Sequence, residues 1–230
     1  MKRFIFVFII FIQTLRVMAQ EVPNTKVDSL YREDQFFFGI TYNLLLNKPD
    51  NVKQNAFSAG FHLGFIRDMP INKRRNLAIG LGLGFSTNSY NENLLITKLE
   101  TGTYNYEILP NAETYRRNKI SNNIIEVPLE FRWRSSTYTE YKFWRIYSGF
   151  KFGYVISDNA KHRGDIGDFD YGNIEDLNEF QYGLTLGVGY NTWNFYAYYG
   201  LNSLLTKDAV LNGNSIDMST LQIGLMFYLL

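Results

Sequence analysis

The chain has 230 residues and no cysteine, and its 23 Lys and Arg nearly balance 22 Asp and Glu, for a formal net charge of +1. This balance lacks the basic excess of nucleic-acid-binding domains, so we expect no nucleic-acid partner. The absence of cysteine excludes disulfides and thiolate metal sites.

Residues 1–19 have the pattern of a secretory signal peptide. A basic start at Lys2 and Arg3 precedes the apolar run Phe4–Ile12, and small residues ending at Ala19 form a cleavage site. The alternative is a retained membrane anchor, but this apolar run is too short to cross about 30 Å of hydrocarbon. We therefore predict export with cleavage of the peptide, which leaves 20 basic and 22 acidic side chains in the mature chain.

Eight later stretches alternate between large apolar residues and small or polar ones. In residues 76–87, every second residue from Leu77 to Phe85 is large and apolar, and the residues between them are glycines and Ala78. A period of two predicts a strand with two unlike faces. Bulky residues opposite glycines suit a membrane barrel, whose large residues meet lipid while its small residues face a crowded lumen. In chain order, the predicted strands are 35–46, 56–67, 76–87, 123–134, 143–156, 179–190, 194–204 and 219–229.

The connections between these strands alternate in length. Those after the third, fifth and seventh strands are long (88–122, 157–178 and 205–218), whereas those after the second, fourth and sixth are short. In outer-membrane barrels the short turns are periplasmic, which places both termini in the periplasm. We predict an all-β fold over residues 35–230, an eight-stranded antiparallel up-and-down transmembrane β-barrel in the outer membrane, preceded by a periplasmic lead-in at 20–34.

A soluble, lipocalin-like barrel is the alternative to a membrane barrel. Such a fold buries its large apolar residues in the interior and keeps glycine mainly in turns. With this sequence, a soluble barrel would have a lumen full of Phe and Leu and a surface of glycine. The pattern therefore favours the membrane barrel.

Charged residues gather on the inner faces of the fourth and fifth predicted strands. They are Glu126, Glu130, Arg132, Arg134, Arg145 and Lys151. A hairpin between these strands would put Glu126 opposite Lys151, and Arg145 near Arg132 within diagonal reach of Glu130. An unpaired charge in a narrow lumen costs several kcal/mol, so we expect a structural salt-bridge network that plugs the barrel. The alternative is a proton or anion path, which eight strands leave little room for.

The remaining candidate sites are weaker. His62 faces the predicted lumen without a nucleophile near it, so we expect a hydrogen-bonded structural histidine. The loop 157–178 holds His162 among several aspartates, whose oxygens suit Ca²⁺, but their spacing does not match an EF-hand, and Ca²⁺ binding stays open. The loop 88–122 predicts a hairpin that extends the third and fourth strands and exposes Tyr104 and Tyr106. We expect no catalytic, cofactor-binding or metal-binding residues.

The segment Ile125-Glu126-Val127-Pro128-Leu129 resembles the I-E-[IV]-P-L strand that recurs near mid-chain in the PorT-like outer-membrane β-barrel families. The likeness extends to the strand around Phe150–Tyr154 and to the layout of about eight strands. These families include components of the type IX secretion system, so the resemblance implies a role in protein secretion.

We therefore expect a non-enzymatic outer-membrane barrel with an accessory or scaffold role and no cofactor. Its expected partners are outer-membrane lipid and other outer-membrane or secretion-system proteins. Two alternatives stay open. A barrel-embedded lipid-modifying enzyme is disfavoured by the scarcity of histidine, and a small-solute channel is disfavoured by the crowded lumen.

Overall fold

The computed structural model describes residues 34–110, 114–135 and 143–229. The predicted signal peptide at 1–19 and nearly all of the predicted lead-in at 20–34 lie outside these residues. In the part of the chain that is described, no helix has the length and apolarity needed to cross a membrane.

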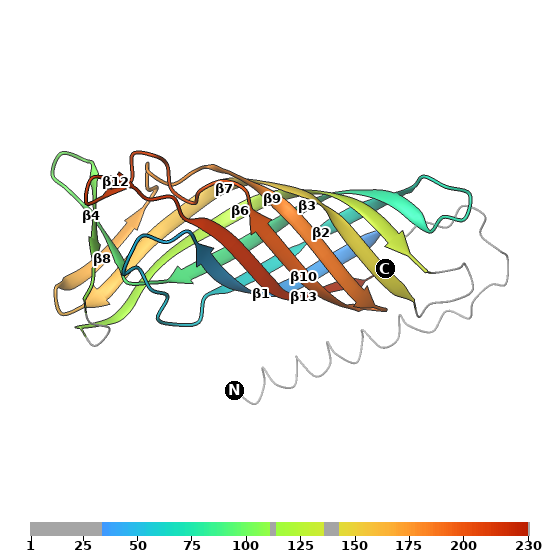
Figure 1. Cartoon of the computed structure of the whole chain (residues 1–230), viewed down its shortest axis with the longest axis horizontal. Helices are drawn as coiled ribbons and strands as arrows, with labels where there is room; N and C mark the ends of the chain where they lie inside the picture. The colour runs from blue at the N-terminus through green and yellow to red at the C-terminus, as the bar shows by residue number, and fades with distance from the viewer. Residues whose placement is uncertain (1–33, 111–113, 136–142, 230) are drawn as a thin grey trace, which may run out of the picture. The chain divides into compact units, whose positions relative to one another are not determined.

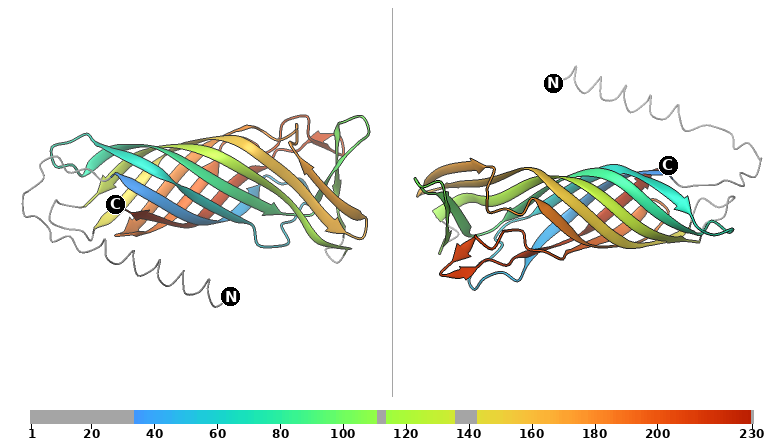
Figure 2. Two further views of the ribbon diagram at one scale, coloured as in Figure 1. Left: turned by 180° about the vertical axis from the view of Figure 1, so that it is seen from behind. Right: turned by 90° about the horizontal axis from the view of Figure 1, so that it is seen from above.

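Eight long strands close into one antiparallel barrel (Figure 1). In chain order they are β1 (Gln35–Leu46), β2 (Ala59–Pro70), β3 (Leu77–Asn91), β6 (Tyr115–Arg134), β7 (Trp144–Gly164), β9 (Phe180–Tyr190), β10 (Trp193–Gly200) and β13 (Ser219–Leu229). Each strand pairs with the next one, and β13 pairs with β1 to close the ring. The strands cross the barrel obliquely (Figure 2). The predicted fold class, an eight-stranded up-and-down barrel, is confirmed.

The outer face of the barrel is a band of exposed apolar side chains. Leu83 is 63% exposed and Phe195 is 74% exposed, whereas the inward-facing Ile66 is 1% exposed. On the inner face, a Cβ atom at Gly82 would lie 2.6 Å from Ile66 Cγ1, so this position has no room for a side chain. Exposed apolar patches of this extent mark membrane or protein interaction surfaces, and a band around a closed barrel fits lipid. The alternation in the sequence thus predicts correctly which face meets the membrane.

Three strands continue well beyond the lipid-facing band. β3, β6 and β7 reach Asn91, Tyr115 and Gly164, and β8 (Gly167–Gly172) adds to the end of β7. The expectation of long loops at 88–122 and 157–178 is therefore wrong. It fails because the outward residues become polar here, as at Lys119, so the pattern of apolar outward residues disappears while the strand pairing goes on.

Two short hairpins complete this end of the barrel. β4 (Leu94–Lys98) pairs with β5 (Tyr104–Ile108), and β11 (Val210–Leu211) pairs with β12 (Asn214–Ser215). The predicted hairpin within 88–122 exists, but it forms a separate two-stranded sheet instead of extending its neighbours. Figure 1 shows β4, β8 and β12 at one end of the barrel and the C-terminus at the other.

These segments close the barrel with an apolar cap. The cap contains Leu45, Val52, Tyr90, Leu94, Ile96, Tyr106, Ile120, Ile124, Val155, Ala160, Ile174, Leu177, Leu204, Leu205, Ala209, Leu211, Ile216 and Met218. The expectation that Tyr106 is exposed is wrong, because its ring packs in the cap and its hydroxyl donates to Asp176 Oδ2 at 2.9 Å. Tyr104 is half-buried.

Two strand boundaries also differ from the prediction. β2 spans 59–70 instead of 56–67, because the inward residues continue to Asp68, which is fully buried. β10 ends at Gly200 instead of residue 204, because Leu204 and Leu205 turn into the cap. Both shifts follow from contacts with distant strands or with the cap, which the local alternation does not contain.

Candidate functional site

The lumen at the C-terminal end of the barrel is filled by two arginines that share one carboxylate. Arg132 Nη1 lies 3.1 Å from Asp68 Oδ1, and Arg134 Nη1 lies 2.8 Å from Asp68 Oδ2. Arg132 Nη2 also donates to Gln35 Oε1 at 2.6 Å, and its guanidinium lies 4.1 Å from the centre of the Tyr147 ring. This arrangement links β1, β2, β6 and β7 across the lumen. It leaves the Asp68 charge compensated by two cations.

Next to this group, Glu130 and Arg145 add one charge of each sign. Glu130 Oε2 lies 3.3 Å from Arg132 Nε, so the carboxylate pairs with its neighbour along the same strand face. The Arg145 guanidinium lies 4.4 Å from the centre of the Phe143 ring. Alternation within β6 and β7 directs Glu130 and Arg145 inward.

The middle of the lumen is organised around Glu126. Its Oε1 lies 2.9 Å from Lys151 Nζ and accepts a hydrogen bond from Ser86 at 2.7 Å, and its Oε2 lies 3.4 Å from His62 Nδ1. His62 Nε2 lies 3.2 Å from Thr41 Oγ1, which belongs to β1. His62 is thus a hydrogen-bonded histidine inside the barrel wall.

Lys151 is held by further groups from the opposite wall. Its Nζ donates to Gln222 Oε1 at 3.4 Å and lies 4.3 Å from the centre of the Tyr198 ring. A lysine ammonium over an aromatic face gains electrostatic stabilisation when it is withdrawn from water. These contacts join β7 to β10 and β13, so the network spans the barrel from wall to wall.

The predicted pairing between β6 and β7 is displaced by two residues. Glu126 pairs with Gly153 and Lys151 pairs with Pro128, so Glu126 and Lys151 are not directly opposite. Arg145 pairs with Arg134 instead of lying nearest to Arg132. The pairing extends to Ser135 and Trp144, and the sequence between them contains no signal, such as Asn-Gly, that would define the register.

All six predicted lumenal residues are buried in the interior, each with 6% exposure or less. Sequence analysis missed Asp68, which lies beyond the predicted end of its strand. It also missed the polar partners Gln35, Ser86 and Gln222, which join the network from other strands. Asp68 follows His62 by an even number of residues along β2, so the two side chains lie on the same face of the strand. The alternation, continued to Asp68, would have placed this side chain inside the barrel.

The network encloses a very small cavity in the lumen. A cavity of about 10 Å³ lies between Glu126, Glu130, Lys151 and the surrounding rings, room for about one water molecule. Side chains of both charges therefore fill the interior at the level of the apolar band. This geometry joins opposite walls of the barrel through buried ion pairs and hydrogen bonds.

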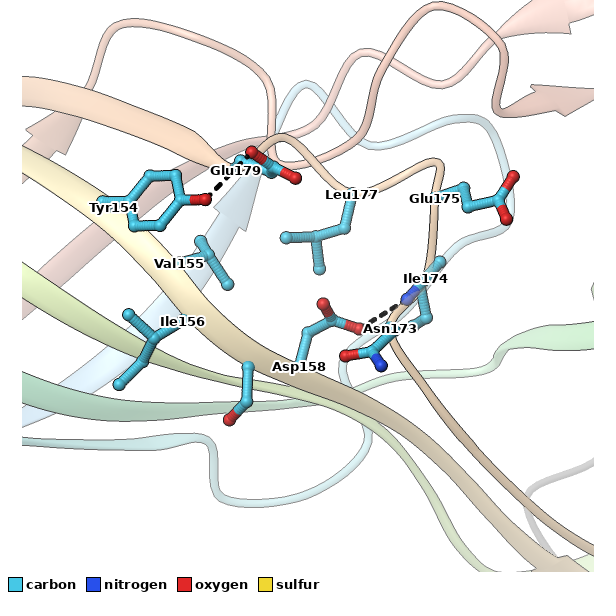
Figure 3. Close-up of a pocket in the computed structure, with 10 residues that line it drawn as sticks. Tyr154, Val155, Ile156, Asp158, Asn173, Ile174, Glu175, Leu177 and Glu179 are labelled. Carbon is cyan, nitrogen blue, oxygen red and sulfur yellow. Dashed lines mark hydrogen bonds between the residues drawn. The ribbon is translucent and has the colours of Figure 1, made fainter.

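A larger pocket opens on the outside of the capped end. It has a volume of about 360 Å³ and lies between β7 and residues 173–179 (Figure 3). Asp158 Oδ1 accepts a hydrogen bond from Ile174 N at 2.8 Å, and Tyr154 donates to Glu179 at 3.3 Å. Burial raises the pKa of Asp158 above its ordinary value.

Part of this pocket lies in the segment 157–178, for which the sequence allows Ca²⁺ binding. Within the residues that the structure describes, no three His, Asp or Glu side chains come together in a way that could hold a metal ion. The buried His162 ring instead contacts Asn118. Its Nδ1 lies 3.1 Å from Asn118 Oδ1. Two aspartates of β8 pair with cations of β7: Asp170 with Lys161 and Arg163, and Asp168 with Arg163.

Comparison with known proteins identifies the family. Among solved structures, the chain is similar to Ail, the attachment invasion locus protein of Yersinia pestis, in complex with the heparin analogue sucrose octasulfate. The identity is 15%, the match covers 87% of this chain and 100% of that chain, and the TM-score is 0.38. No curated protein matches the chain. The family model described as "Outer membrane protein beta-barrel domain" matches residues 18–206, and the chain belongs to this family of outer-membrane β-barrels.

Proposed function

We propose that this protein is a non-enzymatic, non-conducting outer-membrane barrel that serves as an accessory or scaffold subunit. The observation that carries the proposal is the filled lumen, in which Glu126, Lys151 and their partners leave a space of about 10 Å³. An open pore would need a continuous hydrated path, and an apolar cap lies over one end of this barrel as well. Both features favour a structural role for the lumenal charges.

A lipid-modifying enzyme would need reactive groups that a lipid can reach. His62 is 1% exposed, and His162 is 2% exposed beneath the cap. A histidine that acts as a general base must lie within hydrogen-bond reach of a nucleophile in a site open to substrate. The burial of both histidines favours the non-enzymatic assignment.

We assign the capped end to the cell exterior and the termini to the periplasm. The end near the C-terminus carries short connections, such as residues 191–192 between β9 and β10, and the other end carries the hairpins and the cap. Short periplasmic turns and long extracellular connections are the usual arrangement in outer-membrane barrels. In this orientation the barrel presents its hairpins outside the cell.

The secretion role rests on the likeness of Ile125–Leu129 to the PorT-like strand motif. We propose that the chain is an accessory subunit of a type IX-like secretion machine. Deletion of its gene should lower the amount of exported cargo in the culture medium, and the full chain should restore it. A chain whose β4–β5 turn is shortened should fold but restore secretion poorly. Unchanged export in the deletion strain would refute the secretion role and leave the closed barrel intact.

Conductance tests the closed lumen. The purified, folded protein in a planar bilayer should show no stable single-channel steps, because lumenal side chains block the path. The variant Lys151→Ala, Tyr198→Ala should also show no steps, because the Arg132–Asp68–Arg134 group and the apolar cap still close the lumen. Porin-sized steps from the parent protein would contradict the proposal.

Labelling tests the orientation, and the cysteine-free chain makes it simple. In intact cells, an impermeant maleimide should label Thr101→Cys in the exposed β4–β5 turn and should not label Lys73→Cys in the exposed β2–β3 turn. Both should be labelled after the cells are broken. The reverse pattern in intact cells would overturn the assigned orientation.

A further inference from the structure

The short strand β8 forms an open sheet edge beyond the lipid-facing band. It spans six residues, Gly167–Gly172, at the capped end of the barrel (Figure 1). β8 pairs with β7, and among the described residues no other strand lies along its second edge. Such an edge presents a row of unpaired N–H and C=O groups, to which another extended chain can add.

The edge is open because the chain leaves the sheet on this side of the barrel. β8 and β9 pair with β7 one after the other along its length. β10, which flanks β9, ends at Gly200 opposite Gly183. The chain then enters the cap, where Leu204 and Leu205 are buried. The place beside β8 that a longer β10 would occupy therefore holds no strand of this sheet.

The two faces of β8 carry different side chains. Phe169 and Tyr171 lie on the same face as the buried His162, and the centre of the Phe169 ring is 5.8 Å from that of His162 and 6.1 Å from that of Tyr171. Asp168 and Asp170 lie on the opposite face, with side chains 60% and 41% exposed. A strand added beside β8 would set apolar side chains next to the rings and basic side chains next to the carboxylates.

The chain that forms this edge is acidic. Residues 164–179 contain Asp165, Asp168, Asp170, Glu175, Asp176 and Glu179 and no lysine or arginine. Lys161 and Arg163 pair with the aspartates of β8, but they belong to β7. They lie one strand further from the open edge, at a spacing of about 4.8 Å. An added strand therefore meets the acids before it meets these cations, which favours a basic partner.

A second copy of this chain is a poor partner for the same edge. If β8 paired with β8 of another copy, Asp168 and Asp170 would lie beside the same acids of that copy. Like charges on neighbouring strands destabilise the pairing. The acids therefore select against self-association, and they select for a strand of opposite charge.

We propose that β8 binds an extended segment of a partner protein in which basic and apolar residues alternate. The segment adds to the free edge as a further strand, with its basic side chains beside Asp168 and Asp170 and its apolar side chains beside Phe169 and Tyr171. This inference depends on neither the secretion role nor the assigned orientation. The maleimide labelling determines the compartment in which the partner would meet β8.

The probe is the dye-labelled hexapeptide Lys-Val-Lys-Phe-Lys-Val, which has the length of β8 and the alternation that its two faces require. Its fluorescence anisotropy is followed as the full folded chain, in nanodiscs of zwitterionic lipid, is added. Empty nanodiscs measure binding to the lipid alone. The parent should bind this peptide. It should not bind the same sequence N-methylated throughout, which lacks backbone donors, or Glu-Val-Glu-Phe-Glu-Val, which reverses the charge.

Hydrogen exchange and matched variants locate the site. The bound peptide should slow amide exchange at residues 167–172 of the parent. Asp168→Asn with Asp170→Asn should weaken binding about fivefold, because two exposed charge contacts are lost. Glu100→Gln with Glu107→Gln, which changes two exposed acids of the β4–β5 hairpin, should leave the affinity at the parent level. Heat-modifiability on gels should show that both variants are folded.

Four outcomes would overturn the proposal. Equal binding of the N-methylated peptide would exclude strand addition. Equal losses in the two variants would indicate a general charge attraction. Failure of the parent to bind the peptide would show that the acids of β8 only protect its edge from pairing. A dimer of the chain in micelles that the peptide dissociates would identify a second copy as the occupant.

Discussion

Lys151 Nζ lies 2.9 Å from Glu126 Oε1 although the two residues are offset by two positions in the β6–β7 register. The ammonium reaches diagonally across the sheet, and the carboxylate is held in place by Ser86 and His62. Both side chains are almost fully buried. The pair therefore joins neighbouring strands inside the lumen. Bulk water cannot solvate either charge there if its partner is removed.

We predict that Glu126→Gln destabilises the barrel by about 3–5 kcal/mol, because it leaves Lys151 buried without a countercharge. The double variant Glu126→Gln, Lys151→Met should lose less, since no orphan charge remains. Urea unfolding in detergent micelles, followed by the gel shift between folded and unfolded bands, measures both. A single variant as stable as the parent would show that the pair does not stabilise the fold.

The sequence alternation is enough to predict the barrel, its strand number and the identity of the lipid face. It works at Leu83 and Gly82 because lipid and lumen impose opposite size requirements on adjacent residues. It also places the six charged residues of β6 and β7 in the interior. These features depend only on the two-residue period, which is local.

Contacts between distant strands are not contained in that period. The pairing of Asp68 with Arg132 depends on the strand stagger around the ring, and no distinctive sequence signal follows β6 to define the register at Arg134. The alternation does not predict the cap for a related reason. Above the membrane the apolar residues, such as Ile120, face inward, so the pattern inverts where the solvent outside changes from lipid to water.

We predict that Gly149→Ala strongly impairs folding, because a Cβ atom on β7 would collide with the carbonyl oxygen of Leu129. Backbone atoms of a paired strand cannot move aside as a flexible side chain can, and we expect a loss of about 2–3 kcal/mol. Gly187→Ala on β9 is the matched control, since its Cβ would make ordinary contacts at 3.8 Å. Equal folding yields and urea midpoints for the two variants would contradict the prediction.

The stability of the capped end should fall as the pH rises, because of Glu92. Burial raises its pKa to about 8, and Lys48 opposes this shift only in part. The folded state thus holds a proton that the unfolded chain releases above its ordinary pKa near 4.5. The contribution is complete below that value and is lost progressively as the pH approaches 8.

The variant Glu92→Gln should therefore flatten the pH dependence and exceed the parent in stability above pH 8. Urea midpoints of the two proteins, compared between about pH 5 and pH 9, measure this effect. Glu107→Gln is the control, because Glu107 is exposed on the β4–β5 hairpin. If parent and Glu92→Gln respond to pH in parallel, Glu92 does not keep its proton in the folded protein.

We predict that the cap can open without unfolding of the barrel. Asn118 Nδ2 donates to the carbonyl oxygens of Glu92 at 2.9 Å and Leu94 at 2.8 Å, which ties the start of β4 to β6. Asn118→Ala leaves two buried carbonyl groups without this donor, at a cost of about 2 kcal/mol. Asn118 contributes to neither the apolar band nor the lumenal network, so the penalty should fall on the capped end, where its Oδ1 also contacts His162 of β7.

Trypsin measures this opening at Lys98, which is exposed at the end of β4. When opening is fast relative to cleavage, the rate follows the open population, so about 2 kcal/mol should raise it about 30-fold. The gel shift of the barrel should stay at the parent temperature. Asn123→Ala is the matched control, because this asparagine is on the outer face of the same strand and donates only to Ser157. Equal cleavage rates in the two variants, or a lower melting temperature of the barrel in Asn118→Ala, would show that cap and barrel unfold as one unit.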